Sequence, residues 1–451
     1  MRALQGLPVS ARAEALRILC RVEVDAAYAD ILLDRALSRR GLAVRDRALT
    51  TELVYGTLRW QRRLDWHLAR VSRRPLAELD PWVRNLLRLT AYQLLLLDRI
   101  PARAAVHEAV ELAKRLGHPG VAEFVNATLR ALVRSGRELP APLPEDPVAA
   151  LAVRASFPDW LAARWVARYG FAKAEALLAA LNDRAPLTLR VNPLKADPET
   201  LRRTLAGEGI EARPCRFAPD GLVAAGVPAL DRLPALRAGW CVVQDEASIL
   251  VGHLLAPEPG EAVADVCAAP GTKTTHLAGL MADRGRLLAF DPHPGRLGRV
   301  QEACRRLGVS IAECLEGEVA RLAPAYPEAC HRVLVDAPCS NLGVLRRNPE
   351  AKWRCREADL PALKARQRAI LEVAATMVRP GGVLVYATCS LEPEENEGVV
   401  EPFLAAHPAF APAPPPPGFP AACVDARGTL RMLPHRHGSD GFTAVRLRRR
   451  G

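Results

Sequence analysis

Four apolar runs after Trp240 constrain the fold of this chain most strongly. They are AVADVC (262–267), GRLLAFD (285–291), RVLVDAPC (332–339) and GGVLVYATC (381–389). Each run has the length of a buried strand, ends in a polar or small residue, and is separated from the next by a helical pattern. Strands that alternate with helices predict a parallel, doubly wound α/β sheet. Ligands of such sheets bind beyond the carboxyl ends of the strands.

The sequence upstream of these runs predicts a different architecture. A chain of 451 residues exceeds what one core normally serves. From Ala11 to Arg134 apolar residues recur at helical spacing, and the helix breakers of GRELPAPLPEDP (136–147) then predict a linker. TLRVNPLK (188–195) predicts a short strand stopped by Pro193, followed by a helix and extended pieces. We therefore predict a multidomain chain with an all-α domain (1–140), a small α+β domain (146–237) and an α/β domain (238–451).

The basic excess is concentrated at the N-terminal end. Residues 1–140 hold 24 Lys and Arg against 15 Asp and Glu, which gives +9 of the total formal charge of +12. Such a domain could neutralise phosphates and supply sequence-independent affinity for a nucleic acid. A solvated, arginine-rich helical surface explains the charge equally well.

The cysteines and the hydropathy pattern exclude several classes of protein. The 11 cysteines form no Cys-x-x-Cys pair and no His/Cys ladder at zinc spacing, so we expect neither disulfides nor a metal site. No window offers about 18 uninterrupted apolar residues. We expect a soluble cytoplasmic protein that makes no use of a membrane.

The first predicted strand leads into a candidate cofactor loop, Asp265 to Thr274. Its small residues let backbone N–H groups approach a carboxylate, and the following helix N-terminus favours negative charge. A phosphate-binding P-loop is excluded, because Thr272 rather than Gly precedes Lys273 and Cys267 occupies the position of the other required Gly. Asp291 ends the second run and could accept hydrogen bonds from ribose hydroxyls. A helix-capping role explains Asp291 alone equally well.

Two cysteines end the last two runs, Cys339 shortly after Asp336, and Cys389. A thiol at the ligand-binding edge is suited to covalent catalysis. Carbon 5 of a pyrimidine is a poor nucleophile, and a thiolate that adds to carbon 6 turns it into an enamine that can attack a methyl sulfonium. Lys273 could favour the thiolate, and Asp336 could stabilise charge on the base. These arguments do not decide which cysteine adds to the ring.

At this point several motifs resemble those of one family. The chain is similar to the bacterial ribosomal RNA small-subunit methyltransferase B family (the Sun or Fmu proteins), among the RNA 5-methylcytosine methyltransferases. The matching elements are DVCAAPGTKTTH, DAPCSNLGVLRRNPEAKW, GGVLVYATCS with PEEN after it, HGSDGF, LRVNPLK and QDEAS. The N-terminal segments DRALTTELVYGTLR, YQLLLLDRIPARAAVHEAVELAK and FVNATLR resemble the NusB-like helical domain of this family.

The resemblance implies a role for each matching residue. Cys389 is the nucleophile, Cys339 assists product release, and Asp336 contacts both cofactor and base. It also implies S-adenosylmethionine as the cofactor, a Rossmann-like class I methyltransferase domain, a small α+β domain that binds RNA, and a monomer acting on 16S rRNA or a small-subunit precursor. The implied cofactor-binding residues are Cys267, Ala268, Ala269, Pro270, Gly271, Thr272, Lys273, Asp291, Glu318 and Asp336.

The chain departs from the family pattern at three positions. Thr272 stands where the family usually has Gly. Glu318 replaces the Asp that contacts the adenine amino group, with Glu316 as an alternative register. His107 replaces an Asn in the helical domain.

Two other functions compete with ribosomal RNA methylation. One is methylation of a cytosine of transfer RNA or at another ribosomal position, although relatives acting on transfer RNA generally lack the NusB-like domain. The other is a non-catalytic RNA-binding or antitermination protein with a degenerate methyltransferase domain. The four reactive side chains at one edge, Lys273, Asp336, Cys339 and Cys389, argue against the second.

Overall fold

The structure is a computed structural model that describes residue 4 and residues 6–38, 41–227, 230 and 233–451. The chain forms two compact units. The first comprises Met1–Asp183 and Leu345–Glu357, and the second comprises Arg184–Val344 and Ala358–Gly451.

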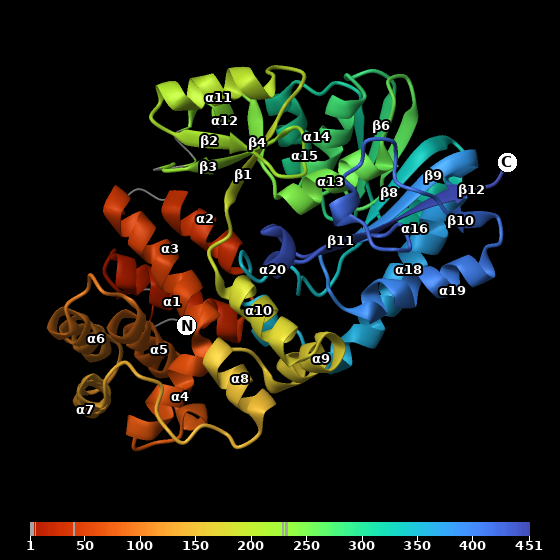
Figure 1. Cartoon of the computed structure of the whole chain (residues 1–451). Helices are drawn as coiled ribbons and strands as arrows, with labels where there is room; N and C mark the ends of the chain where they lie inside the picture. The colour runs from red at the N-terminus through yellow and green to blue at the C-terminus, as the bar shows by residue number, and fades with distance from the viewer. Residues whose placement is uncertain (1–3, 5, 39–40, 228–229, 231–232) are drawn as a thin grey trace. The chain divides into compact units, whose positions relative to one another are not determined.

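The first unit is helical, as predicted. Leucine and alanine side chains of its helices share one core, and α5 is buried along most of its length. Ser10 starts α1 by accepting a hydrogen bond from the backbone N–H of Ala13. The helices, which Figure 1 shows in red to yellow, are α1 (Ala11–Val24), α2 (Ala29–Ser38), α3 (Val44–Arg59), α4 (Gln61–Val71), α5 (Pro81–Leu96), α6 (Ala102–Leu116), α7 (Pro119–Ser135), α8 (Pro147–Ala155), α9 (Asp159–Tyr169) and α10 (Phe171–Asn182).

A segment far along the chain completes this helical unit. Residues 345–357, which contain the short helix α17 (Ala351–Arg354), follow the Cys339 motif in sequence but pack among the N-terminal helices. The Trp353 indole N–H donates to the carbonyl of Leu58 at 2.6 Å. Glu350 accepts a hydrogen bond from the N–H of Ala29 at 3.1 Å. No periodicity in the sequence predicted this placement.

The small α+β domain begins the second unit. Its antiparallel sheet has the order β2-β3-β1-β4, and the apolar faces of β1 and α11 form its core. Its elements are β1 (Leu187–Val191), α11 (Pro198–Gly207), β2 (Glu211–Pro214), β3 (Gly221–Ala225), α12 (Pro234–Arg237) and β4 (Cys241–Val243). The predicted strand stops before Pro193, as expected. Helices α8 to α10, which the predicted boundary at 146 assigned to this domain, lie in the first unit.

The large sheet has the order β10-β12-β9-β8-β5-β6-β7, with β11 paired to β12. Its strands are β5 (Ala262–Asp265), β6 (Arg286–Asp291), β7 (Ala312–Glu316), β8 (Cys330–Asp336), β9 (Val378–Thr388), β10 (Phe410–Pro412), β11 (Leu430–Met432) and β12 (Phe442–Arg449). The prediction of a parallel sheet holds for β5 to β9. Strand β12, which lies outside the four apolar runs, pairs antiparallel with β9 and makes the sheet mixed. The edge strand β7, AECLE, was not predicted, because it has neither an apolar run nor a strict alternation of polar and apolar residues.

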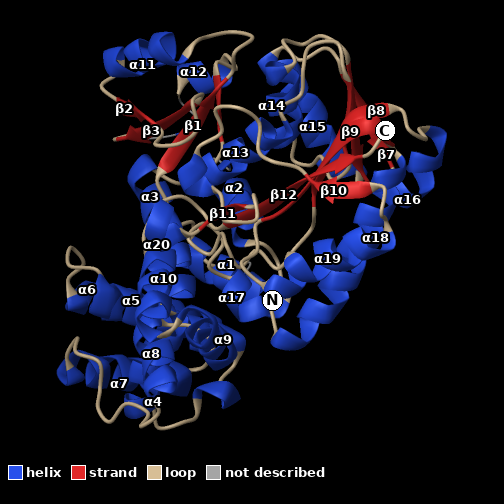
Figure 2. Ribbon diagram, turned by 45° about the vertical axis from the view of Figure 1, so that its right-hand side comes forward, coloured by secondary structure: helices blue, strands red, loops and turns tan. Residues whose placement is uncertain are grey.

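Helices cover both faces of this sheet (Figures 1 and 2). Val263, Leu287 and Leu334 point into the core on the side of α13 and α14. The neighbouring residues Ala264 and Leu288 point to the side of α18 and α19. The covering helices are α13 (Glu246–Leu255), α14 (Thr272–Leu280), α15 (Pro294–Leu307), α16 (Val319–Leu322), α18 (Leu360–Thr376) and α19 (Glu397–Ala406), and α20 (Pro434–His437) precedes the last strand. The parallel strands therefore end at one edge, where the predicted site residues lie.

Within the described ranges, no helix combines the length and the apolar character that crossing a bilayer requires.

Candidate active site

The two strand-end cysteines lie side by side. Strands β8 and β9 are parallel neighbours with Asp336 opposite Ala387, and the N–H of Ala337 continues the pairing by donating to the carbonyl of Ala387. The sulfur atoms of Cys339 and Cys389 are 3.2 Å apart. All 11 cysteines are free thiols. The structure thus brings together the two cysteines that the sequence placed at one edge of the sheet.

Asn341 contacts both thiols, and sequence reasoning missed it. Its side-chain oxygen accepts a hydrogen bond from the Cys389 thiol at 3.0 Å and lies 4.0 Å from the Cys339 sulfur. Asn341 has φ 62°, a left-handed conformation that Asn tolerates better than most residues. Its position two residues after Cys339 was the only available signal.

The two thiols are electrostatically distinct. The hydrogen bond with Cys389, burial, and the negative charges of Cys389 and Glu395 together raise the pKa of Cys339 well above its ordinary value. These groups keep Cys339 protonated.

Lys273 and Asp336 form an ion pair beside the cysteines. The Lys273 ammonium lies 2.7 Å from an Asp336 carboxylate oxygen and 5.0 Å from the centre of the Phe442 ring. Burial disfavours the ammonium, but the attraction of Asp336 outweighs it and raises the pKa of Lys273. The site thus retains a positive charge next to the reactive thiols.

The candidate cofactor loop has a left-handed backbone at Gly271, a conformation that favours glycine. Gly271 has φ 100°, and a Cβ there would lie 3.0 Å from the Cα of Val300. Thr272 is the first residue of α14, without a positive φ, and its carbonyl accepts a hydrogen bond from Arg190 at 2.9 Å. Threonine in place of the family's Gly therefore requires no left-handed backbone. Burial raises the pKa of Cys267 above its normal range, which keeps this third thiol protonated.

The predicted ribose contact, Asp291, ends β6 and is 2% exposed. One of its oxygens accepts a hydrogen bond from the N–H of His293 at 3.0 Å, and Arg296 approaches the other at 3.5 Å. Glu316 pairs with Asp291 in the register of β6 and β7. Glu318 is exposed and precedes α16. Glu316 ends the strand next to Asp291 and Glu318 follows it closely, so both registers for the adenine contact stay open.

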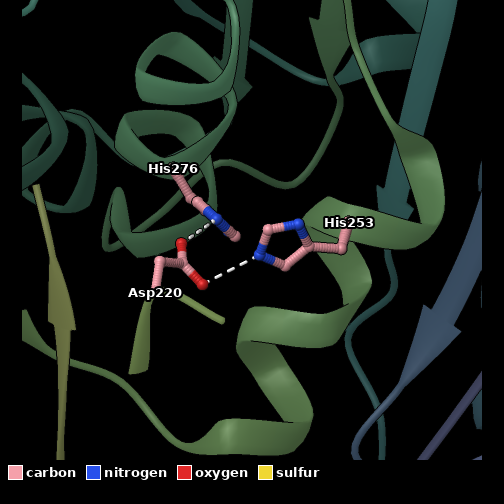
Figure 3. Close-up of side chains that lie close together, drawn as sticks. All are labelled: Asp220, His253 and His276. Carbon is pink, nitrogen blue, oxygen red and sulfur yellow. Dashed lines mark hydrogen bonds and ion pairs between the residues drawn. The ribbon is translucent and has the colours of Figure 1, made fainter. Parts of the chain in front are cut away.

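A His–Asp–His cluster lies elsewhere in the second unit (Figure 3). Among the residues that the structure describes, Asp220, His253 and His276 have ligand-type atoms within 4.8 Å of one another. This is a set that can hold a metal ion. However, each imidazole donates to a different oxygen of Asp220, at 2.8 Å in both cases. Burial and the charge of Arg190 lower the pKa of His276 to about 4. Asp220, the residue before β3, is thus hydrogen-bonded to His253 of α13 and to His276 of α14, and these bonds join the three elements.

Protein-family models match three parts of the chain. The model described as 16S rRNA methyltransferase RsmB/F matches residues 252–448. The NusB family model matches residues 9–134, and the model of the ferredoxin-like domain of RsmF/B-like methyltransferases matches residues 157–228. The three matches confirm the predicted fold classes, a NusB-like helical part, a small α+β part and a methyltransferase part.

Relatives and solved structures cover nearly the whole chain. A probable ribosomal RNA small subunit methyltransferase B of Synechocystis sp. is 38% identical over 98% of this chain and 100% of its own length. Its counterpart in Bacillus subtilis is 39% identical over 98% and 99%. The crystal structure of PH0851 matches with a TM-score of 0.83 and 30% identity over 98% of this chain and 99% of its own. A methyltransferase homologue from Pyrococcus horikoshii matches with a TM-score of 0.60 and 28% identity over 68% and 100%. With its paired cysteines at the strand ends, this chain belongs to the ribosomal RNA small subunit methyltransferase B family.

Proposed function

We propose that the protein methylates carbon 5 of a cytosine in 16S ribosomal RNA, with S-adenosylmethionine as methyl donor and Cys389 as nucleophile. The observation that carries this proposal is the separation of 3.2 Å between the Cys339 and Cys389 sulfurs. The Lys273–Asp336 pair lies at the same edge of the sheet. The names of the relatives support ribosomal RNA as the substrate.

The residues of the site can support each step of the reaction in turn. The Cys389 thiolate forms a bond to carbon 6, and the electron pair of the 5,6 double bond moves toward carbon 5. Asp336 contacts the ring nitrogen and stabilises the charge that develops there. After carbon 5 has taken the methyl group, it loses its proton. The electron pair of the C–H bond restores the double bond, and the bond from carbon 6 to Cys389 breaks.

Cys339 is suited to assist the second half of this sequence. Its pKa is raised first by the hydrogen bond with Cys389, and further by burial and the charge of Cys389. Bond formation at Cys389 removes the hydrogen bond and the charge. Cys339 can then release its own proton to solvent more readily, and the resulting thiolate accepts the proton of carbon 5. The same pair of thiols therefore supports addition and elimination at different stages.

The cofactor site fits the first turn of α14 and the end of β6. When bound, S-adenosylmethionine supplies an electrophilic methyl group. No side chain caps the N-terminus of α14, so its backbone N–H groups are available to a carboxylate. Asp291 would hold the ribose, and Glu318 or Glu316 would contact the adenine amino group. The loop Cys267–Lys273 would bind the rest of the cofactor.

We also propose roles in RNA binding for the parts of the chain outside the catalytic domain. Residues 1–140 hold RNA through their excess of basic residues, the small α+β domain also contacts RNA, and residues 238–451 form the catalytic domain. The protein works as a cytoplasmic monomer on 16S rRNA or a small-subunit precursor. Methylation of another RNA is the second candidate, and bisulfite sequencing of ribosomal and transfer RNA from a deletion strain distinguishes the two.

Substitution of each cysteine tests the mechanism. We expect Cys389→Ala to abolish methylation, because no thiolate adds to carbon 6. We expect Cys339→Ala to accumulate a covalent protein–RNA adduct that survives denaturing electrophoresis, because elimination is impaired. An adduct in the Cys389 variant instead would reverse the two roles. No methylated cytosine from the wild-type protein with cofactor and 16S rRNA would favour the non-catalytic alternative.

A further inference from the structure

A buried carboxylate lies behind the two cysteines. Glu395, in the 3-10 turn Pro393–Glu395, is 0% exposed. One of its oxygens accepts hydrogen bonds from the backbone N–H of Ser340 at 2.8 Å and from the Gln367 side chain at 2.9 Å. The other accepts from the hydroxyl of Ser340 at 2.5 Å and from the hydroxyl of Ser390. These four donors match a carboxylate, which offers acceptors only.

The donors flank both reactive residues. Ser340 follows Cys339 in the chain, and Ser390 follows Cys389. The two serine hydroxyls lie 3.1 Å apart, as the two thiols before them lie 3.2 Å apart. The Gln367 amide that donates to Glu395 also donates to the carbonyl of Pro338 at 3.0 Å. The network therefore holds the chain on both sides of Cys339.

The next residue holds the chain on both sides of Cys389. The Asn396 side-chain oxygen accepts from the Thr388 hydroxyl at 2.6 Å, and its amide donates to the carbonyl of Ser390 at 3.1 Å. The Tyr386 hydroxyl of β9 donates to the backbone carbonyl of Glu395 at 2.7 Å. Glu395 and Asn396 are thus fixed to the strand that carries the nucleophile.

We propose that Glu395 is a positioning residue that sets the separation of the Cys339 and Cys389 sulfurs, and thereby couples adduct formation to product release. It touches neither thiol directly. Besides its charge, which helps to raise the pKa of Cys339, it acts through Ser340 and Ser390, whose chain positions fix the Cα atoms of the reactive residues. This role rests on the proposed function for its catalytic consequence, but not for its geometry.

Glu395→Gln is the sharpest test. The amide keeps the size of the side chain but replaces one acceptor oxygen with an N–H donor, which must face two of the four donors. Glu401→Gln is the matched control, because it makes the same change at an exposed side chain of α19, which forms an ion pair with the exposed Arg427. Thermal unfolding shows which variants stay folded.

The first readout needs no activity. In the full-length protein, the rate at which diamide joins Cys339 to Cys389, measured by peptide mass spectrometry, reports how often the sulfurs meet. We expect Glu395→Gln to slow this cross-link at least about tenfold and Glu401→Gln to leave it unchanged. Equal rates in a folded Glu395→Gln protein would overturn the positioning role even if the protein proved not to methylate RNA.

The second readout is the partition between adduct and product. With 16S rRNA and S-adenosylmethionine, we expect Glu395→Gln to lower kcat at least about tenfold with little change in the KM for RNA. We also expect a larger fraction of covalent adduct per methylated cytosine than in the wild type. Loss of adduct and product in proportion to the folded fraction would indicate a merely structural role and contradict the proposal. Absence of methylation by the wild type would count against the proposed function, whereas the cross-link rate would still decide the role of Glu395.

Discussion

The two units each bury a lysine, and the surroundings of the two side chains are opposite. Lys273 at the catalytic edge pairs with the Asp336 carboxylate at 2.7 Å. Lys352 in the helical unit is 1% exposed, and its ammonium donates to the carbonyl of Arg59 at 2.8 Å and to the Asn182 side-chain oxygen at 3.1 Å. It also lies 4.0 Å from the centre of the Phe157 ring.

The difference shows that a counter-charge decides whether the pKa of a buried lysine is raised or lowered. Asp336 outweighs burial and raises the pKa of Lys273. Burial and the nearby charge of Arg59 lower the pKa of Lys352 well below its ordinary value. Lys273 therefore keeps its positive charge beside Asp336. Lys352 acts mainly as a hydrogen-bond donor that fixes residues 345–357 within the helical unit.

The largest expected effect is on the rate of methyl transfer, which should fall after substitution of Lys273 but not of Lys352. Lys273→Met removes the charge beside the thiols and Asp336, and we expect single-turnover methyl transfer to fall by about 10²–10³. Lys352→Met lies in the other unit, and we expect a change of about threefold or less in the folded protein. Rapid-quench assays with saturating cofactor measure both rates. Comparable losses in the two variants would remove the functional distinction.

Charge reversal on the helical unit tests its role in holding RNA. Arg103 and Arg115 are exposed on α6, so Arg103→Glu with Arg115→Glu should leave the core intact. If each arginine neutralises one phosphate, the slope of log affinity against log salt becomes shallower by roughly 0.7 per residue. Filter binding at several salt concentrations measures the slope, and calorimetry should show unchanged cofactor affinity.

Arg427→Glu is the control for this experiment, since Arg427 is exposed in the second unit. If Arg103→Glu with Arg115→Glu leaves the slope of log affinity against log salt unchanged, these arginines do not contact RNA phosphates and are part of the solvated surface. Deletion of residues 1–146 is a less specific test. It also removes the carbonyls of Leu58 and Arg59 that hold Trp353 and Lys352.

The third prediction concerns pH. The folded pKa of Lys352 lies below its unfolded value of about 10.4, so the unfolded chain binds more protons in the window between them. The contribution of Lys352 to stability therefore rises with pH up to about 10.4, by at most about 1.4 kcal/mol per pH unit. Lys273 has a raised pKa, and its contribution is present below about 10.4 and is lost at higher pH.

Chemical denaturation followed by tryptophan fluorescence between pH 7 and 10 measures this difference. We expect the stability of Lys352→Met, relative to wild type, to decline as the pH rises. A constant offset across this range would show that Lys352 is buried with its charge.

The smallest expected effect concerns the cofactor. Asp291→Ala removes hydrogen bonds to the ribose, each worth roughly 0.5–1.5 kcal/mol, or about two- to tenfold in affinity. Lys352→Met should leave cofactor affinity unchanged, which provides the comparison between the units. Calorimetry that shows wild-type affinity in Asp291→Ala would refute the ribose contact.

Several elements could be predicted from the sequence because their patterns are local. The apolar runs predicted β5, β6, β8 and β9, and helical periodicity predicted the N-terminal unit. Strand β7 was missed because its sequence, AECLE, lacks an apolar run. The antiparallel pairing of β12 could not be predicted, because direction depends on how the chain returns to the sheet and not on the composition of the strand.

The sequence by itself determined which side chains reach the catalytic edge, because parallel strands all end there and each strand's last residues follow from its apolar run. Only the tertiary structure decided how these side chains act on one another. Cys339 and Cys389 are 50 residues apart in the chain, and their contact depends on the pairing of β8 with β9. Two of the residues that donate to Glu395, Ser340 and Gln367, and the counter-charge of Lys273 likewise come from distant segments. Hydrogen bonds and ion pairs act over a few ångströms of space whatever the sequence separation, so no local pattern encodes them.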